Sequence, residues 1–367
     1  MPGGARLRLK EGTVLRILET SPRTQRCTVR VEGEEAEALC YPELTGPLAR
    51  GDRVWLNTAA LELGLGSGGY HLVAAVPGRL PPGAPLPGRI MKLRYTPWQL
   101  AVEAVEEAAP DRLREGDLEG MPVVVGSLHS QLLPVALGFQ AASGGLPLAY
   151  VMTDGGALPA ALSRSAAALR ARGLLAGTVT CGHAFGGDLE AVHPASGLLA
   201  ARTVLGAAGA AVIMGPGITG TGSAWGHTAL EQGSLLDLAS ALGGDPVAVV
   251  RISQRDARVR HQGVSHHTLT ALGRVAARPA TVVLPLLHDR GRLRGLQRQL
   301  WEAGVLRRHR LVHVPVSRDL VRALAAEPEA RTMGRDVEEE QAFFEAALAA
   351  GWEAGRRARR RQGGVDG

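Results

Sequence analysis

Two adjacent histidines stand where they could do chemistry. His266 and His267 follow Ser265 in the stretch VSHHTLTALG. Serine is a common N-cap, so this stretch predicts a helix whose first turn carries both imidazoles. The positive end of a helix disfavours imidazolium, and neutral imidazoles can bind a metal or transfer a proton. His266 and His267 are therefore candidate catalytic residues, with Arg251 upstream as a candidate anion-binding residue. Alternatively, because adjacent helical side chains diverge by about 100°, only one of the two histidines faces the site.

A second group of polar residues occupies the stretch GHAFGGDLEAVH, which contains His183, Asp188 and His193. Histidine and carboxylate side chains bind divalent metals, although this spacing matches no established metal motif. His183 and Asp188 are candidate catalytic residues and, together with His193, candidate metal ligands. The alternatives are that Asp188 caps a helix and that His193, which precedes a proline, ends a turn.

The glycine-rich stretch MGPGITGTGSAWGH contains the letters GxGxxG after an apolar run. A dinucleotide fingerprint would begin its helix inside the motif and would place an acidic residue at the end of the next strand; neither feature is present. Backbone amides and hydroxyls in such a loop can instead bind an anion, and the alternative is a structural turn without a ligand. The candidate cofactor-binding residues here are Gly215, Gly217, Thr219, Gly220 and Thr221.

The strands and helices that would position these loops are predicted from residue 120 onward. Apolar runs such as MPVVVGSL and AAVIMGPG alternate with helical stretches, which predicts a doubly wound, mostly parallel sheet of six or seven strands. Ligands of such sheets bind beyond the carboxyl ends of the strands. Eight of the eleven histidines fall in the loops expected there: His129, His183, His193, His227, His261, His266, His267 and His288.

The N-terminal region has a different pattern. Five short strands between residues 8 and 77, separated by turn signals, predict a small antiparallel β-barrel of the OB-like or SH3-like kind. The predicted organisation is a barrel at 1–78, a proline-rich linker and connecting helix at 79–119, and the α/β domain at 120–330. A C-terminal helix and basic tail follow at 331–367, where we expect a solvated helix end.

The composition argues against several classes of protein. The net charge is +6, and the segment RRARRR alone contributes five arginines, so nucleic-acid binding is not expected. The only lysines are Lys10 and Lys92, which argues against a P-loop ATPase and against a pyridoxal-phosphate enzyme. No apolar run of about eighteen residues and no signal peptide is found, so we expect a cytoplasmic protein without a membrane partner. An oligomer is compatible with the sequence.

Several longer words in the chain carry a family resemblance. LNTAALELGLGSGGYHLV, GRIMKLRYTPWQL, TDGGALP, GHAFGGDLEAV and RHQGVSHHT together resemble a bacterial family described as a domain of unknown function, DUF3866. The resemblance extends over roughly residues 10 to 330, with small departures at Ala59 and Ser67, where threonines are expected. The family has no assigned activity, so the resemblance implies no substrate and no catalytic residue.

Two functional hypotheses follow. The favoured one is an enzyme that acts on a small anionic metabolite, phosphorylated or nucleotide-like, with a divalent metal as a candidate cofactor. The other is a non-catalytic ligand-sensing or assembly protein whose β-barrel binds a partner. In the enzyme, His183, Asp188 and His266 are expected to border one cavity with the loop at 215–223.

Overall fold

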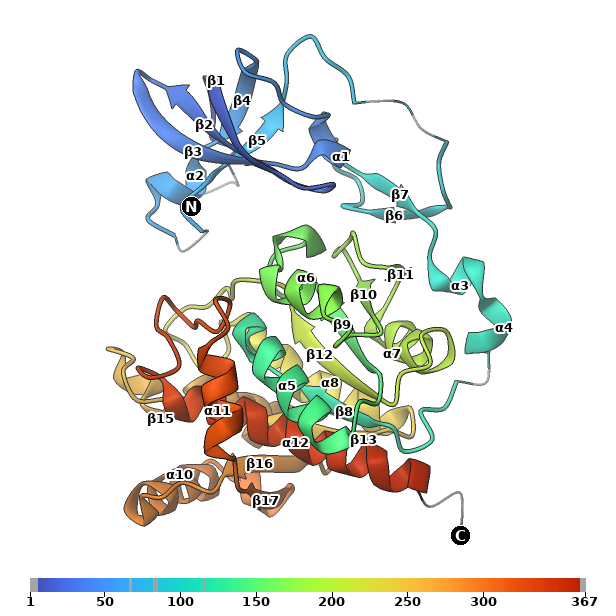
Figure 1. Ribbon diagram of the computed structural model, residues 1–367, viewed down its shortest axis with the longest axis vertical. Coiled ribbons are helices and arrows are strands. Elements are labelled where there is room, and N and C mark those ends of the chain that lie inside the picture. The colour runs from blue at the N-terminus through green and yellow to red at the C-terminus, as the bar shows by residue number, and fades with distance from the viewer. Residues whose placement is uncertain (1–5, 66–67, 82, 84, 115, 364–367) are drawn as a thin grey trace. The chain divides into compact units, whose positions relative to one another are not determined.

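The change of sequence pattern along the chain corresponds to two structural units in the computed structural model (Figure 1). The structure describes residues 6–65, 68–81, 83, 85–114 and 116–363. The first unit is Met1–Leu86 and the second is Pro87–Gly367. No helix among the described residues is both long enough and apolar enough to cross a lipid bilayer.

The first unit is a closed five-stranded barrel, as the sequence predicts. Its strands are β1 (Leu9–Thr20), β2 (Gln25–Val31), β3 (Glu34–Cys40), β4 (Arg53–Asn57) and β5 (His71–Ala75). They close in the order β1-β2-β3-β5-β4, and all pairs are antiparallel except β3 with β5. Alternate residues point inward, so that Val14, Val29 and Leu56 form part of a small apolar core.

The second unit is built on an eight-stranded parallel sheet. Its strands are β8 (Pro122–Val125), β9 (Leu148–Thr153), β10 (Gly177–Cys181), β11 (Leu189–Ala191), β12 (Gly209–Met214), β13 (Asp245–Val249), β16 (Thr281–Pro285) and β17 (Arg310–Val314). They lie in the order β11-β10-β9-β12-β8-β13-β16-β17. Seven of these strands were expected; the eighth, β11, lies in a segment that the sequence analysis treated as a loop.

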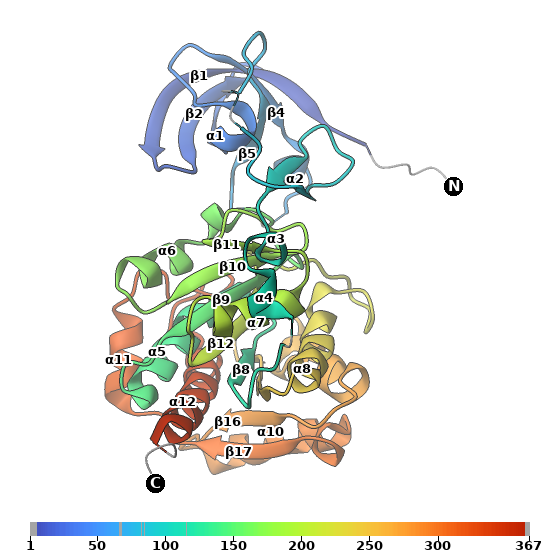
Figure 2. The ribbon, with the colours of Figure 1, turned by 90° about the vertical axis from the view of Figure 1, so that its right-hand side faces the viewer.

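Helices cover both faces of this sheet, which explains why its strands are continuous apolar runs (Figures 1 and 2). In β8, Val123 and Val125 belong to one buried cluster and Val124 belongs to the other. The first cluster includes residues of α7 (Pro194–Thr203), α8 (Glu231–Ala241) and α10 (Arg290–Glu302). The second includes residues of α5 (Leu132–Ser143), α6 (Arg164–Ala171), α11 (Arg318–Ala325) and α12 (Gln341–Gly363).

The C-terminal helix α12 is a core element over most of its length, which was not expected, and only its last residues, 359–363, form an exposed helix end. Thirteen of its residues are buried, including Phe343 and Phe344. It packs against α5 (Figure 1) so closely that a side chain at Gly138 would overlap the backbone oxygen of Leu348. The alanine and glycine residues that made α12 look weakly apolar are the residues that allow this close approach.

A short hairpin, β6 (Ile90–Lys92) and β7 (Leu100–Val102), precedes the sheet and anchors its edge. Lys92 is fully buried, and its Nζ donates to the backbone oxygens of Thr180 (3.2 Å) and Ala191 (3.0 Å). The same amine forms an ion pair with Glu190 (3.2 Å). Lys92 therefore ties the hairpin to β10 and β11.

Candidate functional site

The connections of the sheet diverge at its centre. From β8 the chain leads to β9 on one side, and from its neighbour β13 it leads to β16 on the other side. Such a divergence leaves a crevice beyond the carboxyl ends of the strands, where ligands of doubly wound sheets bind. The loops after β12 and β13 meet at this place and bring the candidate histidines together.

The glycine-rich loop after β12 folds back on itself. Gly220 and His227 form an antiparallel bridge, the amide of Thr221 donates to the oxygen of Gly226 (2.7 Å), and the amide of Thr228 donates to the oxygen of Thr219 (2.9 Å). The amide of Thr219 is also bonded within the loop, to Thr228 Oγ1 (3.3 Å). These amides therefore bond within the loop itself, and its fixed shape holds His227 against α9 (His266–Thr270).

The remaining glycines of the loop have structural surroundings. A side chain at Gly215 would overlap the backbone oxygen of Ala157, and Gly217 has a φ of +85°, a backbone conformation that favours glycine. A side chain at Gly220 would start 3.6 Å from His267 Nε2. Gly220 thus leaves open the space in front of that imidazole.

The second loop presents the adjacent histidines. The hairpin β14 (Ile252–Ser253) and β15 (Gly263–Val264) leads into α9 (His266–Thr270), and Ser265 caps this helix by accepting the amide of His267 (3.3 Å). The predicted N-cap is confirmed. Both imidazoles turn toward His227, contrary to the alternative in which only one faces the site.

Four imidazoles form one group, which we call the histidine cluster: His227, His261, His266 and His267. The ring centroids of His227 and His267 are 4.0 Å apart and stacked, and those of His266 and His267 are 4.4 Å apart. His261 lies 4.8 Å from His267 and 4.9 Å from His266. His261 Nδ1 is 2.7 Å from Ser265 Oγ, so it supports the start of α9.

Burial and neighbouring positive charge keep these imidazoles neutral at pH 7. Desolvation, followed by repulsion from the other imidazoles and from Arg251, lowers the pKa of His267 to about 2. Desolvation, then His227 and Arg260, lower the pKa of His266 to about 4. Desolvation with Arg251 and Arg258 lowers the pKa of His261 to about 3. Burial is therefore the main reason why these imidazoles are neutral. The positive end of the α9 dipole, on which the prediction was based, is not needed to explain it.

Arg251 stands behind the histidine cluster. Its guanidinium donates to His267 Nδ1 (3.1 Å) and lies 3.6 Å from the carboxylate of Asp256. Arg258 binds the same carboxylate through two hydrogen bonds and holds the pKa of Asp256 well below its usual range. The carboxylate in turn keeps the buried Arg251 in place, although desolvation lowers the pKa of Arg251 to about 10.

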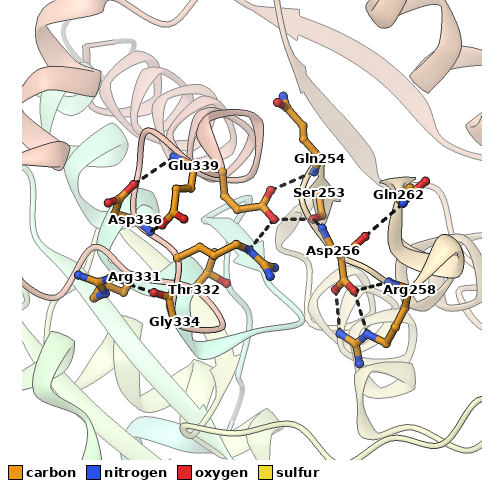
Figure 3. A network of polar contacts seen from close by, with 12 residues as sticks. Ser253, Gln254, Asp256, Arg258, Gln262, Arg331, Thr332, Gly334, Asp336 and Glu339 are labelled. Atoms are coloured by element: carbon orange, nitrogen blue, oxygen red, sulfur yellow. Dashed lines mark hydrogen bonds and ion pairs between the residues drawn. The ribbon is translucent and has the colours of Figure 1, made fainter.

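The segment before α12 fastens this loop from the other side (Figure 3). Glu340 is fully buried; it accepts from Ser253 Oγ (2.6 Å) and from the amide of Gln254 (3.0 Å), and it forms an ion pair with Arg335 (2.8 Å). Ser253 Oγ also accepts the amide of Asp256 (3.1 Å). Residues of the predicted tail therefore help to position Arg251, a role that the sequence analysis did not anticipate.

Arg260 is an exposed charge close to the histidine cluster. It contributes to the lowered pKa of His266, and one of its guanidinium nitrogens would lie 4.0 Å from a side chain placed at Gly222. Within the described part of the chain it forms no ion pair with a carboxylate. Arg260 is therefore free to bind an anion between the glycine-rich loop and α9.

The three candidates from the second group have other contacts. His183 Nε2 is 3.0 Å from the guanidinium of Arg94, Asp188 forms an ion pair with Arg170, and His193 caps α7 by accepting the amide of Ala195. No hydrogen bond, ion pair or ring contact joins them to the histidine cluster in the described residues. The structure thus brings His266 and His267 together with His227, but not with His183 or Asp188.

A half-buried carboxylate lies at the end of β9. Glu231, the first residue of α8, accepts from Thr153 Oγ1 (2.7 Å), and desolvation, with a contribution from Asp154, raises its pKa to about 7. Asp154 itself accepts the amide of His183 (2.9 Å). The sequence analysis missed Glu231, because a glutamate in the first turn of a helix normally serves the helix dipole at the surface.

A cavity of about 250 Å³ opens at the carboxyl end of β16. Its walls include Gln254, His288, Arg292, Glu338 and Glu345. None of the four imidazoles lines it. The cavity therefore adjoins the loop that carries Arg251 without containing the histidine cluster.

Comparison with known proteins identifies the family of the chain. No curated protein and no solved structure matches it. The model of one family, described as "Protein of unknown function (DUF3866)", matches residues 37–351 and so includes the end of the barrel, the complete sheet and the histidine cluster. The resemblance noted in the sequence is confirmed: the chain belongs to the DUF3866 family.

Proposed function

We propose that the chain is an enzyme that acts on a small anionic metabolite, phosphorylated or nucleotide-like, at the carboxyl ends of β12, β8 and β13. The observation that carries this proposal is the buried histidine cluster beside two arginines, Arg251 and Arg260. Neutral imidazoles can accept or donate a proton, and guanidinium groups bind phosphate and carboxylate. Strongly perturbed ionisable groups at strand ends are typical of active sites.

The two arginines have different roles in this proposal. Arg251 is buried and already bonded to His267, so it orients the imidazole. Arg260 is exposed and has no carboxylate partner among the described residues, so it receives the anionic group of the substrate. A charge-assisted hydrogen bond of this kind contributes about 1.5–3 kcal/mol.

An aromatic side chain on the same loop favours a ligand with a planar part. Trp225 is 59% exposed and lies two residues before His227. Arg274 approaches its ring at 5.9 Å and so fixes the indole without burying it. An exposed indole held in this way can stack on a nucleobase, which supports the nucleotide-like class of substrate.

One observation favours the alternative, a sensing or assembly protein. The outer face of the barrel exposes Trp55 (44%) on β4 and Leu72 (40%) on β5, and the two strands are paired. Exposed apolar side chains on adjacent strands suit contact with a protein partner. In that case the α/β unit would bind an effector without converting it.

Turnover distinguishes the two functions. The full chain is incubated with pools of phosphorylated and nucleotide metabolites, and mass spectrometry follows each compound. We expect one anionic metabolite to be consumed in large molar excess over the protein. Arg260→Ala should raise KM by about 10–100-fold with little change in kcat. Arg294→Ala, at an exposed position of α10, is the matched control and should change neither constant. Stoichiometric binding of a metabolite without any turnover would refute the enzyme and support the sensor.

A further inference from the structure

Three imidazoles of the histidine cluster meet around one small space. His227 comes from the glycine-rich loop after β12, whereas His266 and His267 come from α9 after β13. One ring nitrogen of each lies within 4.8 Å of the others. In the described part of the chain, this is the one group of three or more histidine, cysteine or acidic residues that meets this criterion. We call it the three-histidine group.

Two rings of this group, His227 and His266, have ring nitrogens without a well-formed hydrogen bond. Neither ring nitrogen of His227 has a hydrogen bond of good geometry, and the backbone of Ala224 offers this ring only a weak one. Nε2 of His266 has no hydrogen bond. His227 is only 6% exposed, so water does not replace the missing bonds at its surface. An unpaired buried polar group costs about 1–3 kcal/mol, and three such nitrogens in one place indicate a missing ligand.

A cation binds one nitrogen of each of the three imidazoles at once. Neutral imidazoles cannot all hydrogen-bond to each other in this arrangement, but each can donate a lone pair to the same metal ion. Imidazole nitrogen suits zinc, cobalt, nickel and copper, whereas magnesium and calcium prefer oxygen ligands. No carboxylate or thiolate belongs to the group, which excludes a site built for the oxygen-preferring ions.

We infer that His227, His266 and His267 bind a divalent transition metal of the zinc class, with the fourth position open to water or to an anion. Metal–nitrogen bonds of about 2.1 Å place tetrahedral ligand atoms about 3.4 Å apart. The three nitrogens would therefore close by about an ångström on binding. Three protein ligands with one open position are typical of catalytic zinc. The inference goes beyond the proposed function, because a bound metal would serve an enzyme or a sensor equally.

Arg251 acts on this site as a positioning residue. Its guanidinium can only donate, so His267 Nδ1 accepts and the ring proton stays on Nε2. His267 can bind the metal in two ways. In the first, Arg251 releases Nδ1, the ring proton moves to Nδ1, and Nε2 becomes free to bind the metal. In the second, the metal replaces Arg251 at Nδ1. The arginine therefore opposes the metal twice, through its hydrogen bond and through its positive charge.

This opposition gives the inference a distinctive signature. Replacing Arg251 by methionine keeps the length of the side chain but removes the charge and the donor. A single positive charge near a divalent ion weakens its binding by about tenfold even when the two are screened as in bulk water. Arg251→Met should thus tighten metal binding by about tenfold or more, which a purely structural role of Arg251 would not produce.

The experiment uses the full chain, stripped of metal with a chelator and titrated with Co²⁺ and then with Zn²⁺. We expect one equivalent of Co²⁺ per chain, a visible absorption of the intensity typical of four-coordinate cobalt, and its loss when Zn²⁺ is added. His227→Ala and His266→Ala should each weaken binding by more than about 100-fold, since even loss of an outer-layer partner of a metal ligand weakens metal affinity by 10–100-fold. His288→Gln, at an exposed position outside the group, should bind as the wild type does.

Folding of each variant is checked by circular dichroism without metal. The inference is overturned if the wild type binds neither ion at micromolar concentration, if both histidine variants retain the cobalt spectrum, or if Arg251→Met binds more weakly than the wild type. Metal binding without turnover would leave the site intact and refute the enzyme. Turnover by the stripped protein, without Co²⁺ or Zn²⁺ binding, would refute the metal site and leave the proposed enzyme intact.

Discussion

The half-buried carboxylate of Glu231 should make the stability of the α/β unit depend on pH. Its pKa is raised from 4.5 to about 7 by desolvation, with Asp154 as the nearest charge that adds to this effect. Tyr150, whose own pKa is raised, is the other ionisable group coupled to it. Glu231→Gln keeps the shape of the side chain and an acceptor for Thr153 Oγ1 but cannot ionise.

The sign and size of the effect follow from the two pKa values. Below pH 4.5 the carboxyl is protonated in both the folded and the unfolded chain, so it has no effect on the free energy of unfolding. As the pH rises toward 7, the unfolded chain loses the proton first, and the folded state becomes less stable. One pKa unit corresponds to 1.36 kcal/mol, so the difference between 4.5 and about 7 corresponds to about 3 kcal/mol. Because the side chain is partly exposed, solvent screening reduces this to about 2 kcal/mol.

Differential scanning calorimetry of the full chain at pH 4.5 and pH 8 measures this effect. For a unit of this size about 2 kcal/mol corresponds to about 4 °C, so Glu231→Gln should raise Tm by about that amount at pH 8 and by little at pH 4.5. Glu302→Gln, at an exposed position of α10, is the control and should not show this pH dependence. An equal change in Tm at both pH values for Glu231→Gln would refute the reasoning, because it would mean that Glu231 ionises in the folded chain as it does in water.

Three further predictions concern packing and capping. Gly138→Ala should lower the stability of the α/β unit by about 1–3 kcal/mol, because the added methyl overlaps the backbone of α12. Gly295→Ala, at an exposed position of α10 with open space around it, should instead raise stability by about 0.5–1 kcal/mol. Urea unfolding of both variants measures these two changes. Ser265→Ala should cost about 2 kcal/mol in the same assay, since the cap of α9 and the partner of His261 are lost together. Removal of 341–363 should abolish the cooperative calorimetric transition of the α/β unit while leaving that of the barrel, and a truncated chain that keeps both transitions would contradict the core role of α12.

The sequence predicted the sheet well because a parallel sheet leaves a strong local signal. Val123, Val124 and Val125 are consecutive and all buried, which happens only where both faces of a strand are covered. The strand β11 leaves no such signal, since it is three residues long and only Ala191 is buried in it. The burial of α12 was also hidden, because alanine and glycine contribute little apolar area until another backbone comes close to them.

The site was predictable in its place but not in its members. Strand-end loops can be read from the sequence, and four of the eight histidines assigned to them lie together in the histidine cluster. Which of these histidines touch depends on how each loop folds. The hairpin of the glycine-rich loop turns His227 toward α9. In the loop that carries His183, ion pairs hold Glu190 to Lys92 and Asp188 to Arg170. The buried Glu340, about ninety residues from the loop that it holds, has no local signal at all.

The burial of α12 also has a consequence for how the protein is made. Its main neighbour, α5, is synthesised about 200 residues earlier, and at about 5–20 residues per second this separation corresponds to roughly 10–40 s. During that time the nascent chain exposes the apolar side of α5 and one face of β8 and β13, which α12 later covers. The α/β unit must therefore complete its core after translation of all its strands, and until then it exposes apolar surface that the folded unit buries.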